Sequence, residues 1–404
     1  MKLEKDAKMT KSLSTRAVRA GINSDTAFGA IVPPLVLSAN FSFDGLEGKR
    51  RYDYTRSGNP TRDQLADTLA SLEGGAGAVV TATGMAAVTL VLHALLEPGD
   101  RLLVPNDCYG GSWRLFTTLA KKGAFELDSC DFTNRSALDA ALLHKPDLVW
   151  VETPSNPLLR ITDLAVVTAA AHEVGALVAV DNTFLSPALQ RPIEHNADIV
   201  VHSTTKYING HSDVVGGAAI TRDPALVEQL AWWANALGLT GAPFDSYLTL
   251  RGLRTLDARL RIQQANCAAI AEVLEQDPRV ATVHYPGLAG HPGHAIAALQ
   301  QDGFGAMLSF ELRGGDDAAR AFVEGLACIA LAESLGGVES LIAHPSSMSH
   351  AVLSEDERAR AGIGPGLLRL SVGIEDLDDL IVDIQSGLGR VRLEPEHRLV
   401  KEPI

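Results

Sequence analysis

The region from Arg62 to Thr221 alternates short apolar runs with longer segments in which apolar residues recur at helical spacing. The apolar runs read AVVTAT, RLLVP, DLVWVE, LVAVD, DIVVHS and GGAAIT. The segment before the first run ends at Gly74-Gly75 and the segment after it ends at Pro98-Gly99, which are common stop signals for helices. Short runs of this kind indicate strands buried on both faces, so we expect a mainly parallel sheet covered by helices on both sides.

The two ends of the chain follow other patterns. The first sixty residues contain VPPLVLSANFSF and YDYTRSGNPT, which are rich in Pro, Gly, Asn and Ser and keep neither a helical nor a strand period. After Arg254 a long helical segment, RLRIQQANCAAIAEVLEQ, precedes the strand-like runs AMLSFEL and LLRLSVG. We therefore expect an N-terminal arm over residues 1–61, a ligand-binding α/β domain over 62–255 and a smaller C-terminal α+β domain over 256–404.

Composition excludes several classes of protein. The chain has 404 residues, is 46% hydrophobic and carries a formal net charge of −14. Binding to nucleic acid requires clustered Lys and Arg, and the basic residues here are scattered among acids, so we expect no nucleic-acid partner. The start of the chain, MKLEKDAKMTK, is charged and lacks the apolar segment of a secretory signal. We expect a cytoplasmic protein without a membrane partner, and we interpret the apolar stretch over residues 78–96 as a strand followed by a buried helix because it contains Gly84 and His93.

The sequence gives no pattern typical of a metal centre. The four cysteines are far apart and form no CxxC pair, as is usual for reduced cytosolic thiols; they are Cys108, Cys130, Cys267 and Cys328. Two histidine pairs lie among Gly, Pro and Ser, as loop residues do; they are His291 with His294, and His344 with His350. We expect no bound metal.

Polar side chains gather where the apolar runs end. Thr83, Gly84 and Met85 follow the first run, Asn156 follows DLVWVE, Asp181 ends LVAVD, and Ser203 to Lys206 follow DIVVH. In open α/β sheets this carboxyl edge is where ligands bind. Pyridoxal 5'-phosphate (PLP) needs an amine for its aldehyde, an anion for its ring nitrogen and donors for its phosphate. The edge offers all of these, with Lys206 and Asp181 as the amine and the anion, so we predict a PLP site.

The phosphate of this cofactor is expected at the start of the helix that follows AVVTAT. The backbone N–H groups of Gly84 and Met85 lie there, and the helix dipole favours an anion at that end. Gly84 also permits close approach of the ligand. The hydroxyl groups of Ser203 and Thr205 are expected to add donors.

Nearly the whole chain is covered by segments similar to those of the Cys/Met-metabolism PLP-dependent enzymes. These segments are STTKYINGHSDVVGG, DNTFLSPALQ, ETPSNPLLRITD, RSGNPTRDQLADTLASLEGG, ATGM, AESLGGVESL, LRLSVGIEDLDDL, DCYGGSWRLF, QLAWWANALGLTGAPFDSYLTLRGLRTL and GFGAMLSFEL. The resemblance implies a PLP-dependent transferase of fold type I, the aspartate aminotransferase-like fold. It also implies a homotetramer built from two dimers, with active sites shared across the dimer interface.

The resemblance assigns further cofactor contacts. It implies that Lys206 holds PLP covalently and moves protons during the reaction, and that Asp181 pairs with the pyridine nitrogen. Tyr109 resembles the tyrosine that stacks on the pyridine ring and assists proton transfer. Tyr54 and Arg56 match a YxR segment that reaches the PLP phosphate of the neighbouring subunit. Further contacts are implied for Asn156.

The substrate contacts are also implied by the resemblance. Arg369 matches the arginine that binds the substrate α-carboxylate, a bidentate task that suits a guanidinium, and Ser334 and Asn156 complete this contact. Three residues match positions near the outer part of the substrate: Arg114, expected to attract a succinyl carboxylate, Glu333, expected to attract the amino group of an incoming cysteine, and Asp53. One departure concerns Ser57, which stands where related synthases carry a second arginine.

The activity implied is a γ-replacement in transsulfuration and methionine biosynthesis, in which O-succinyl-L-homoserine and L-cysteine give L-cystathionine and succinate. Cleavage of cystathionine and sulfhydrylation of an O-acylhomoserine use the same residues and remain alternatives. Gly111 stands where methionine γ-lyases carry a cysteine, which argues against that activity. A PLP-binding regulatory protein without activity is a further alternative.

Overall fold

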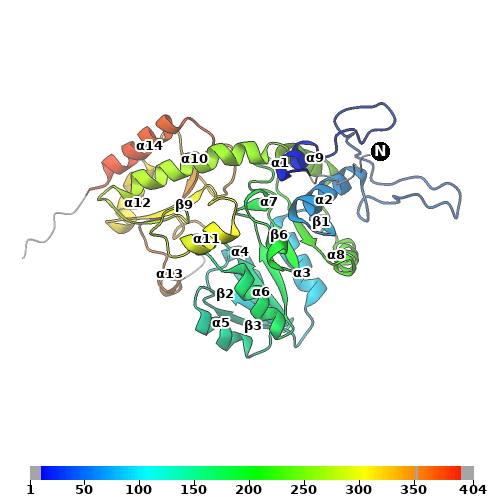
Figure 1. Ribbon diagram of the computed structural model, residues 1–404, viewed down its shortest axis with the longest axis horizontal. Coiled ribbons are helices and arrows are strands. Elements are labelled where there is room, and N and C mark those ends of the chain that lie inside the picture. Colours follow the sequence, from blue (N-terminus) through cyan, green and yellow to red (C-terminus); the bar gives the residue numbers. More distant parts are fainter. Residues whose placement is uncertain (1–10, 350, 352–353, 393–404) are drawn as a thin grey trace, which may run out of the picture.

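The computed structural model describes residues 11–349, 351 and 354–392. Within this range lie a seven-stranded sheet formed by residues 77–221 and a five-stranded sheet formed by residues 280–371. Figure 1 shows the two sheets side by side, with the N-terminal loops extending at the far end from the smaller sheet. His350, one of the histidines considered as a metal ligand, lies outside the described residues.

The larger sheet is mixed, with most strands parallel. Its strands are β1 (Gly77–Thr81), β2 (Arg101–Pro105), β3 (Glu126–Cys130), β4 (Leu148–Glu152), β5 (Leu177–Asp181), β6 (Ile199–His202) and β7 (Gly217–Thr221). They lie in the order β1-β7-β6-β5-β4-β2-β3. β7 runs antiparallel to both of its neighbours, so β1 still points the same way as β6. The predicted mainly parallel sheet is confirmed.

Helices cover both faces of this sheet. One face packs against α3 (Gly84–Leu95), α4 (Gly110–Lys121) and α8 (Pro224–Leu237). The other face packs against α2 (Pro60–Glu73), α5 (Arg135–Leu142), α6 (Leu164–Glu173) and α9 (Pro243–Leu253). The short α7 (Ser186–Leu189) and the 3₁₀ turn η1 (Pro192–His195) connect β5 to β6. Because both faces are covered, ligands can reach the sheet only from its edges and strand ends.

The helix boundaries follow from local sequence signals. α2 begins with Pro60 after Asn59, whose side chain accepts hydrogen bonds from the N–H groups of Thr61 and Arg62. It ends at Gly74, which adopts the left-handed conformation with φ of 80° that favours glycine at this position. The apolar stretch over residues 78–96 forms β1 and α3, as expected. Among the described residues, none of the helices is long and apolar enough to cross a membrane.

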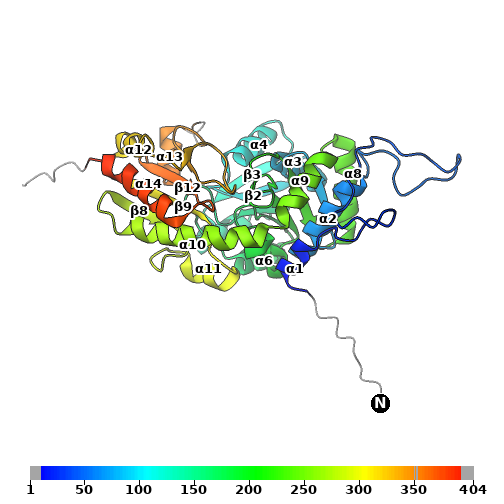
Figure 2. The same cartoon turned by 90° about the horizontal axis from the view of Figure 1, so that it is seen from above.

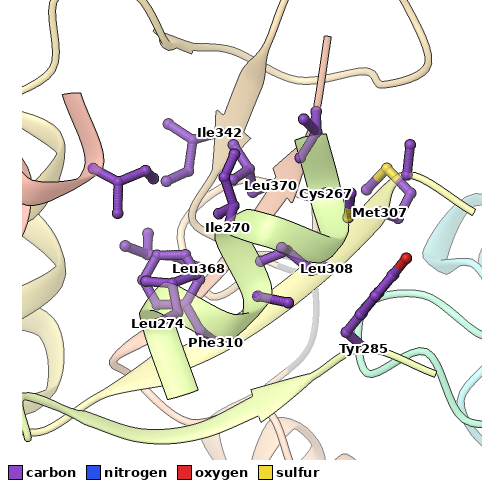
Figure 3. Close-up of a cluster of buried hydrophobic side chains, with 14 of the residues drawn as sticks. Cys267, Ile270, Leu274, Tyr285, Met307, Leu308, Phe310, Ile342, Leu368 and Leu370 are labelled. Atoms are coloured by element: carbon purple, nitrogen blue, oxygen red, sulfur yellow. The ribbon is translucent and has the colours of Figure 1, made fainter. Parts of the chain in front are cut away.

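The smaller sheet lies at the C-terminal end of the chain. Its strands run in the order β10 (Ala330–Leu331), β11 (Leu341–Ala343), β12 (Leu367–Ser371), β9 (Met307–Leu312) and β8 (Val280–His284). The long helix α10 (Leu256–Glu275) packs its apolar side chains, including Cys267, Ile270 and Leu274, against β9 and β12 (Figure 3). The remaining helices are α11 (His294–Gln300), α12 (Gly315–Val323), α13 (Glu355–Ala361) and α14 (Leu377–Arg390).

The described part of the N-terminal arm has one helix, α1 (Leu13–Val18), which the sequence pattern did not predict. Ala17 of this helix is buried in the same apolar cluster as α2. The remainder consists of loops with a single bridge between Asn40 and Tyr54. Figures 1 and 2 show these loops extending away from the body of the molecule. The domain boundaries stay a prediction.

Candidate active site

The carboxyl ends of β4, β5 and β6 lie side by side because these strands pair in parallel. β4 ends at Glu152 and β5 at Asp181, and these two residues are register partners. β6 ends at His202, and the following turn contains Ser203 and Lys206. The sheet topology therefore brings two carboxyl groups and one amino group to a common edge.

Lys206 directs its amino group toward the C-terminal part of the chain. Its Nζ donates a hydrogen bond to the hydroxyl of Ser334 at 2.8 Å. The pKa of Lys206 is lowered from 10.5 to about 8, mainly by burial and also by the positive charge of Arg369, while the charge of Glu333 acts in the opposite direction. An amine with this pKa is partly neutral near physiological pH, the form that bonds to an aldehyde.

Arg369 joins the two sheets at the site. From β12 its Nη1 donates to Oδ1 of Asn156 at 2.9 Å, and its Nη2 donates to the carbonyl of Ser334 at 3.1 Å. Its side chain is buried, and burial lowers the pKa of Arg369 to about 10. The structure thus brings four of the predicted residues together: Lys206, Asn156, Ser334 and Arg369.

Asp181 is a partly buried carboxylate that forms no salt bridge with a cationic side chain among the described residues. One oxygen accepts a hydrogen bond from the backbone N–H of Thr183 at 3.0 Å. Burial raises the pKa of Asp181, while the hydrogen bonds from Thr183 and the charge of His202 act against this rise. A pyridinium nitrogen beside this carboxyl group would supply the missing opposite charge, so Asp181 fits the cofactor that the sequence predicts.

The start of α3 fits an anion. The hydroxyl of Thr83 caps this helix by accepting from the N–H of Ala86 at 2.8 Å, and the N–H groups of Gly84 and Met85 have no intrahelical acceptor. A Cβ atom on Gly84 would lie 2.7 Å from Cβ of Ser203, so glycine is required for this close packing. Thr205 differs from the expectation in detail, since its hydroxyl is bonded to both backbone groups of Gly216.

Tyr109 precedes the first residue of α4, and its side chain is 41% exposed. Its ring lies directly over Gly111: a Cβ atom at position 111 would come within 2.5 Å of Cε1 of Tyr109. The tyrosine is also close enough to Arg369 to influence the pKa of that guanidinium. The ring therefore stands near the substrate side of the site.

The predicted residues of the arm do not join this group within one chain. Nη1 of Arg56 donates to the carbonyl and to Oδ1 of Asn235 at the end of α8, each at 2.8 Å, and its guanidinium lies 5.7 Å from the ring of Tyr54. Asp53 pairs with Lys49 at 2.9 Å and accepts a hydrogen bond from the hydroxyl of Ser57. In the single chain these side chains therefore contact the arm itself and the end of α8.

The two remaining charged residues expected at the outer substrate are exposed. Glu333 directly precedes Ser334. Its charge partly opposes the lowering of the pKa values of Lys206 and Arg369, so it lies near the site. Arg114 lies exposed on the second turn of α4. Among the described residues, no cluster of His, Cys, Asp or Glu could hold a metal ion, and all four cysteines are free.

Glu152 is a site residue that the sequence interpretation missed. Its side chain is buried, with one oxygen accepting from the N–H of Tyr109 at 2.7 Å and the other from the N–H of Asn156 at 3.2 Å. Burial raises the pKa of Glu152 well above its usual range, and the neighbouring charge of Asp181 adds to this effect. The signal was present in the sequence, because DLVWVE and LVAVD both end in a carboxylate.

The sheet topology, the amine and the carboxylate at the carboxyl edge of the sheet, and the free helix start define a PLP-dependent enzyme of fold type I, the aspartate aminotransferase-like class. Comparison with known proteins agrees. The family model described as Cys/Met metabolism PLP-dependent enzyme matches residues 14–389. The chain belongs to this family, and it is an enzyme that depends on PLP.

Several relatives are similar over almost their whole length. The cystathionine gamma-synthase of Escherichia coli is 55% identical over 94% of this chain and 98% of its own. A solved structure of cystathionine gamma synthase from Xanthomonas oryzae pv. oryzae, in complex with aminoacrylate and cysteine, is 65% identical, with a TM-score of 0.94 and coverage of 95% and 99% of the two chains. The cystathionine gamma-lyase of Dictyostelium discoideum is 44% identical over 94% of this chain and 98% of its own.

Proposed function

We propose that this enzyme forms L-cystathionine and succinate from O-succinyl-L-homoserine and L-cysteine, a step of transsulfuration. In the net reaction the Cγ–O bond of the ester breaks, and succinate leaves with the electron pair. The cysteine sulfur forms the new Cγ–S bond, and the thiol proton is released. The observation that carries the proposal is the 65% identity, over 95% of this chain, to the Xanthomonas oryzae synthase, which has also been solved in complex with cystathionine.

We propose residue roles from the family resemblance, supported for Lys206, Asn156, Ser334 and Arg369 by their contacts. Lys206 holds the cofactor covalently, Asp181 pairs with its ring nitrogen, and Tyr109 stacks on its ring. Gly84, Met85, Ser203 and Thr205 would hold the phosphate of PLP, together with Tyr54 and Arg56 of a neighbouring copy, and Asn156 would add a further cofactor contact. When bound, PLP supplies an electron sink that stabilises negative charge beside the substrate amino group.

The chain's own groups bind the substrate and move protons. Arg369, with Ser334 and Asn156 beside it, binds the α-carboxylate through two guanidinium nitrogens. The amino group of Lys206, at 2.8 Å from the Ser334 hydroxyl, removes and returns protons at the α and β carbons. Glu333 attracts the amino group of cysteine, Arg114 attracts the succinyl carboxylate, and Asp53 contributes to the outer pocket from a neighbouring copy.

We propose that the enzyme is a homotetramer of two dimers, in which neighbouring copies share active sites. The proposed location is the cytoplasm. Support for sharing comes from the arm, in which Arg56 binds Asn235 on α8 of its own chain and lies beside the ring of Tyr54. A site that needs these residues is complete only when a second copy supplies them.

A product assay with purified enzyme tests the reaction. Incubation with cysteine and either the succinyl or the acetyl ester of homoserine should give cystathionine. The succinyl ester should have a kcat/KM higher by about one to two orders of magnitude, since one partly exposed charge pair contributes about 1 to 3 kcal/mol. Arg114→Ala should reduce this ratio, whereas Arg135→Ala, an exposed arginine paired with Asp139 on α5, should not. Faster cleavage of cystathionine than its synthesis would instead establish a γ-lyase.

A further inference from the structure

The carboxyl group of Glu152 connects two loops of the active site. The N–H of Tyr109 belongs to the loop after β2, and the N–H of Asn156 belongs to the loop after β4. Oε2 of Glu152 accepts from the first at 2.7 Å, and Oε1 accepts from the second at 3.2 Å. One side chain that is 7% exposed therefore fixes the backbone of both loops.

These two loops carry the side chains that face cofactor and substrate. Tyr109 begins α4 without a side-chain cap, so the carboxylate of Glu152 holds the backbone at the entry to this helix. Oδ1 of Asn156 accepts from Nη1 of Arg369, and Nη2 of Arg369 donates to the carbonyl of Ser334. The hydroxyl of Ser334 accepts in turn from Nζ of Lys206. Glu152 thus lies at one end of a continuous series of hydrogen bonds that reaches Lys206.

Charge also couples Glu152 to the cofactor side of the site. Asp181 is its register partner on β5; Glu152 is buried and Asp181 is partly buried, and burial raises the pKa of both carboxyl groups. Asp107 and Cys108, from the loop after β2, also face Glu152, and His202 on β6 acts on Asp181. A cation beside Asp181 would lower the repulsion between the two carboxyl groups, so binding of the cofactor and the charge of Glu152 are linked.

We propose that Glu152 is a positioning residue, which holds the Tyr109 ring over the cofactor and holds Asn156 against Arg369 for the substrate carboxylate. The inference rests on the proposed function for the roles of Tyr109 and Arg369. It is independent of which homoserine ester reacts, because binding of the cofactor is measured without substrate.

The test uses Glu152→Gln in the full-length enzyme. Glutamine keeps the shape but has one acceptor oxygen, so one of the two backbone N–H groups loses its partner. We expect the dissociation constant of PLP, titrated into the apo-enzyme, to rise about tenfold, the effect of one hydrogen bond to a charged group. The visible circular dichroism of bound PLP should weaken, because the Tyr109 ring is displaced. The KM of the acylhomoserine should rise more than kcat falls.

Asp383→Asn is the matched control. Asp383 on α14 is also buried, and its carboxylate accepts from the backbone N–H groups of Ala327, Cys328 and Ile329 at 2.6 to 2.9 Å, away from the site. This variant should lower the thermal midpoint and leave PLP affinity and circular dichroism unchanged. If Glu152→Gln behaves in the same way, Glu152 has only a structural role and the inference is wrong.

A second variant and a double mutant separate the remaining outcomes. Glu152→Asp keeps the carboxyl group and shortens the side chain, so it should show the same changes in PLP affinity and dichroism if Glu152→Gln does not fold. The effects of Glu152→Gln and Asn156→Ala on KM should be less than additive, since both act through Arg369. Full additivity would overturn this part of the inference. If the wild-type enzyme binds PLP normally but makes no cystathionine, the proposed reaction is wrong, whereas the inference about the positioning role of Glu152 still stands.

Discussion

At the scale of single residues, the amino group of Lys206 is set up to react with an aldehyde. Burial and Arg369 lower its pKa to about 8, and the neutral amine is the reactive form. We expect the apo-enzyme to bind PLP faster as the pH rises, and the plot of this rate against pH should have an inflection near 8. Stopped-flow absorbance measures the rate. Borohydride reduction and peptide mapping should then find the label on Lys206. A rate that keeps increasing toward pH 10.5, or a label on another lysine, would contradict this assignment.

The same pKa determines a pH dependence of stability. Between about 8 and 10.5 the unfolded lysine holds a proton that the folded one has lost, so the apo-enzyme gains stability as the pH rises through this range. Lys206→Met removes the buried ammonium group. The variant should therefore be the more stable protein below pH 8, and its advantage should shrink above it, as measured by thermal midpoints.

Gly111 controls the position of the Tyr109 ring. Because an added Cβ would lie 2.5 Å from Cε1 of Tyr109, Gly111→Ala should displace the ring. Overpacking of this kind costs about 1 to 3 kcal/mol, so kcat/KM should fall about tenfold or more, together with the visible dichroism of bound PLP. Gly389→Ala, on α14 with open space around it, serves as the control and should leave both quantities unchanged. An active Gly111→Ala enzyme with normal dichroism would show that the ring adjusts without consequence.

At the scale of elements, the strands that carry the site were predictable because each is a short apolar run with a polar residue at its end. β3 and α5 were not predicted: β3 reads ELDSC and is only partly buried along its length, so it lacks the apolar run of a central strand. The position of β7 between β1 and β6 was also beyond the sequence, since strand pairing depends on contacts distant in the chain. The role of Glu152 in the site was missed for the same reason. Glu152 lies beside Asp181 only because β4 and β5 are neighbours in the sheet.

A buried polar contact ties α2 to the strands beneath it. Oε1 of Glu73 accepts from Nε2 of His202 at 2.6 Å and from Nδ2 of Asn182 at 3.1 Å, and the Glu73 and His202 side chains are fully buried. Glu73→Ala leaves the buried Nε2 of His202 without its partner and removes one of the two acceptors of Asn182 Nδ2, which keeps the carbonyl of Gln190. We therefore expect the free energy of unfolding to fall by about 2 to 5 kcal/mol. Urea unfolding of the apo-enzyme measures this loss.

Two variants control for this contact. Glu73→Gln keeps one acceptor oxygen and should lose less stability than Glu73→Ala. Glu97→Ala, an exposed glutamate in the turn after α3, should change the free energy of unfolding by no more than about 0.5 kcal/mol. A loss for Glu73→Ala as small as that for Glu97→Ala would mean that the contact adds no stability.

At the scale of the whole molecule, the described arm has large apolar side chains without a core of its own. Phe28 is 92% exposed and Ile31 is 63% exposed in the single chain. The sequence alone indicated an arm with little core, and only the resemblance to a family indicated where it binds. The proposed second copy, if it covers this arm, would account for the exposure of these side chains.

Mixed subunits test the shared site. Tyr54→Ala and Lys206→Ala enzymes should each be nearly inactive. When they are dissociated and reassembled together, part of the activity should return, because one site in each hybrid dimer receives Tyr54 and Lys206 from intact chains. Mass spectrometry must show that hybrids form. Hybrids without activity would place Tyr54 outside the neighbouring site.

The contact between Lys206 and Ser334 spans 128 residues of sequence. A ribosome adds about 5 to 20 residues per second, so the lysine emerges on the order of ten seconds before the serine that binds it. During this interval the larger sheet can fold, yet its reactive amine still lacks the hydrogen-bond acceptor from the smaller one. Maturation of this enzyme therefore has a fixed order, in which a complete cofactor pocket exists only after most of the chain has been synthesised.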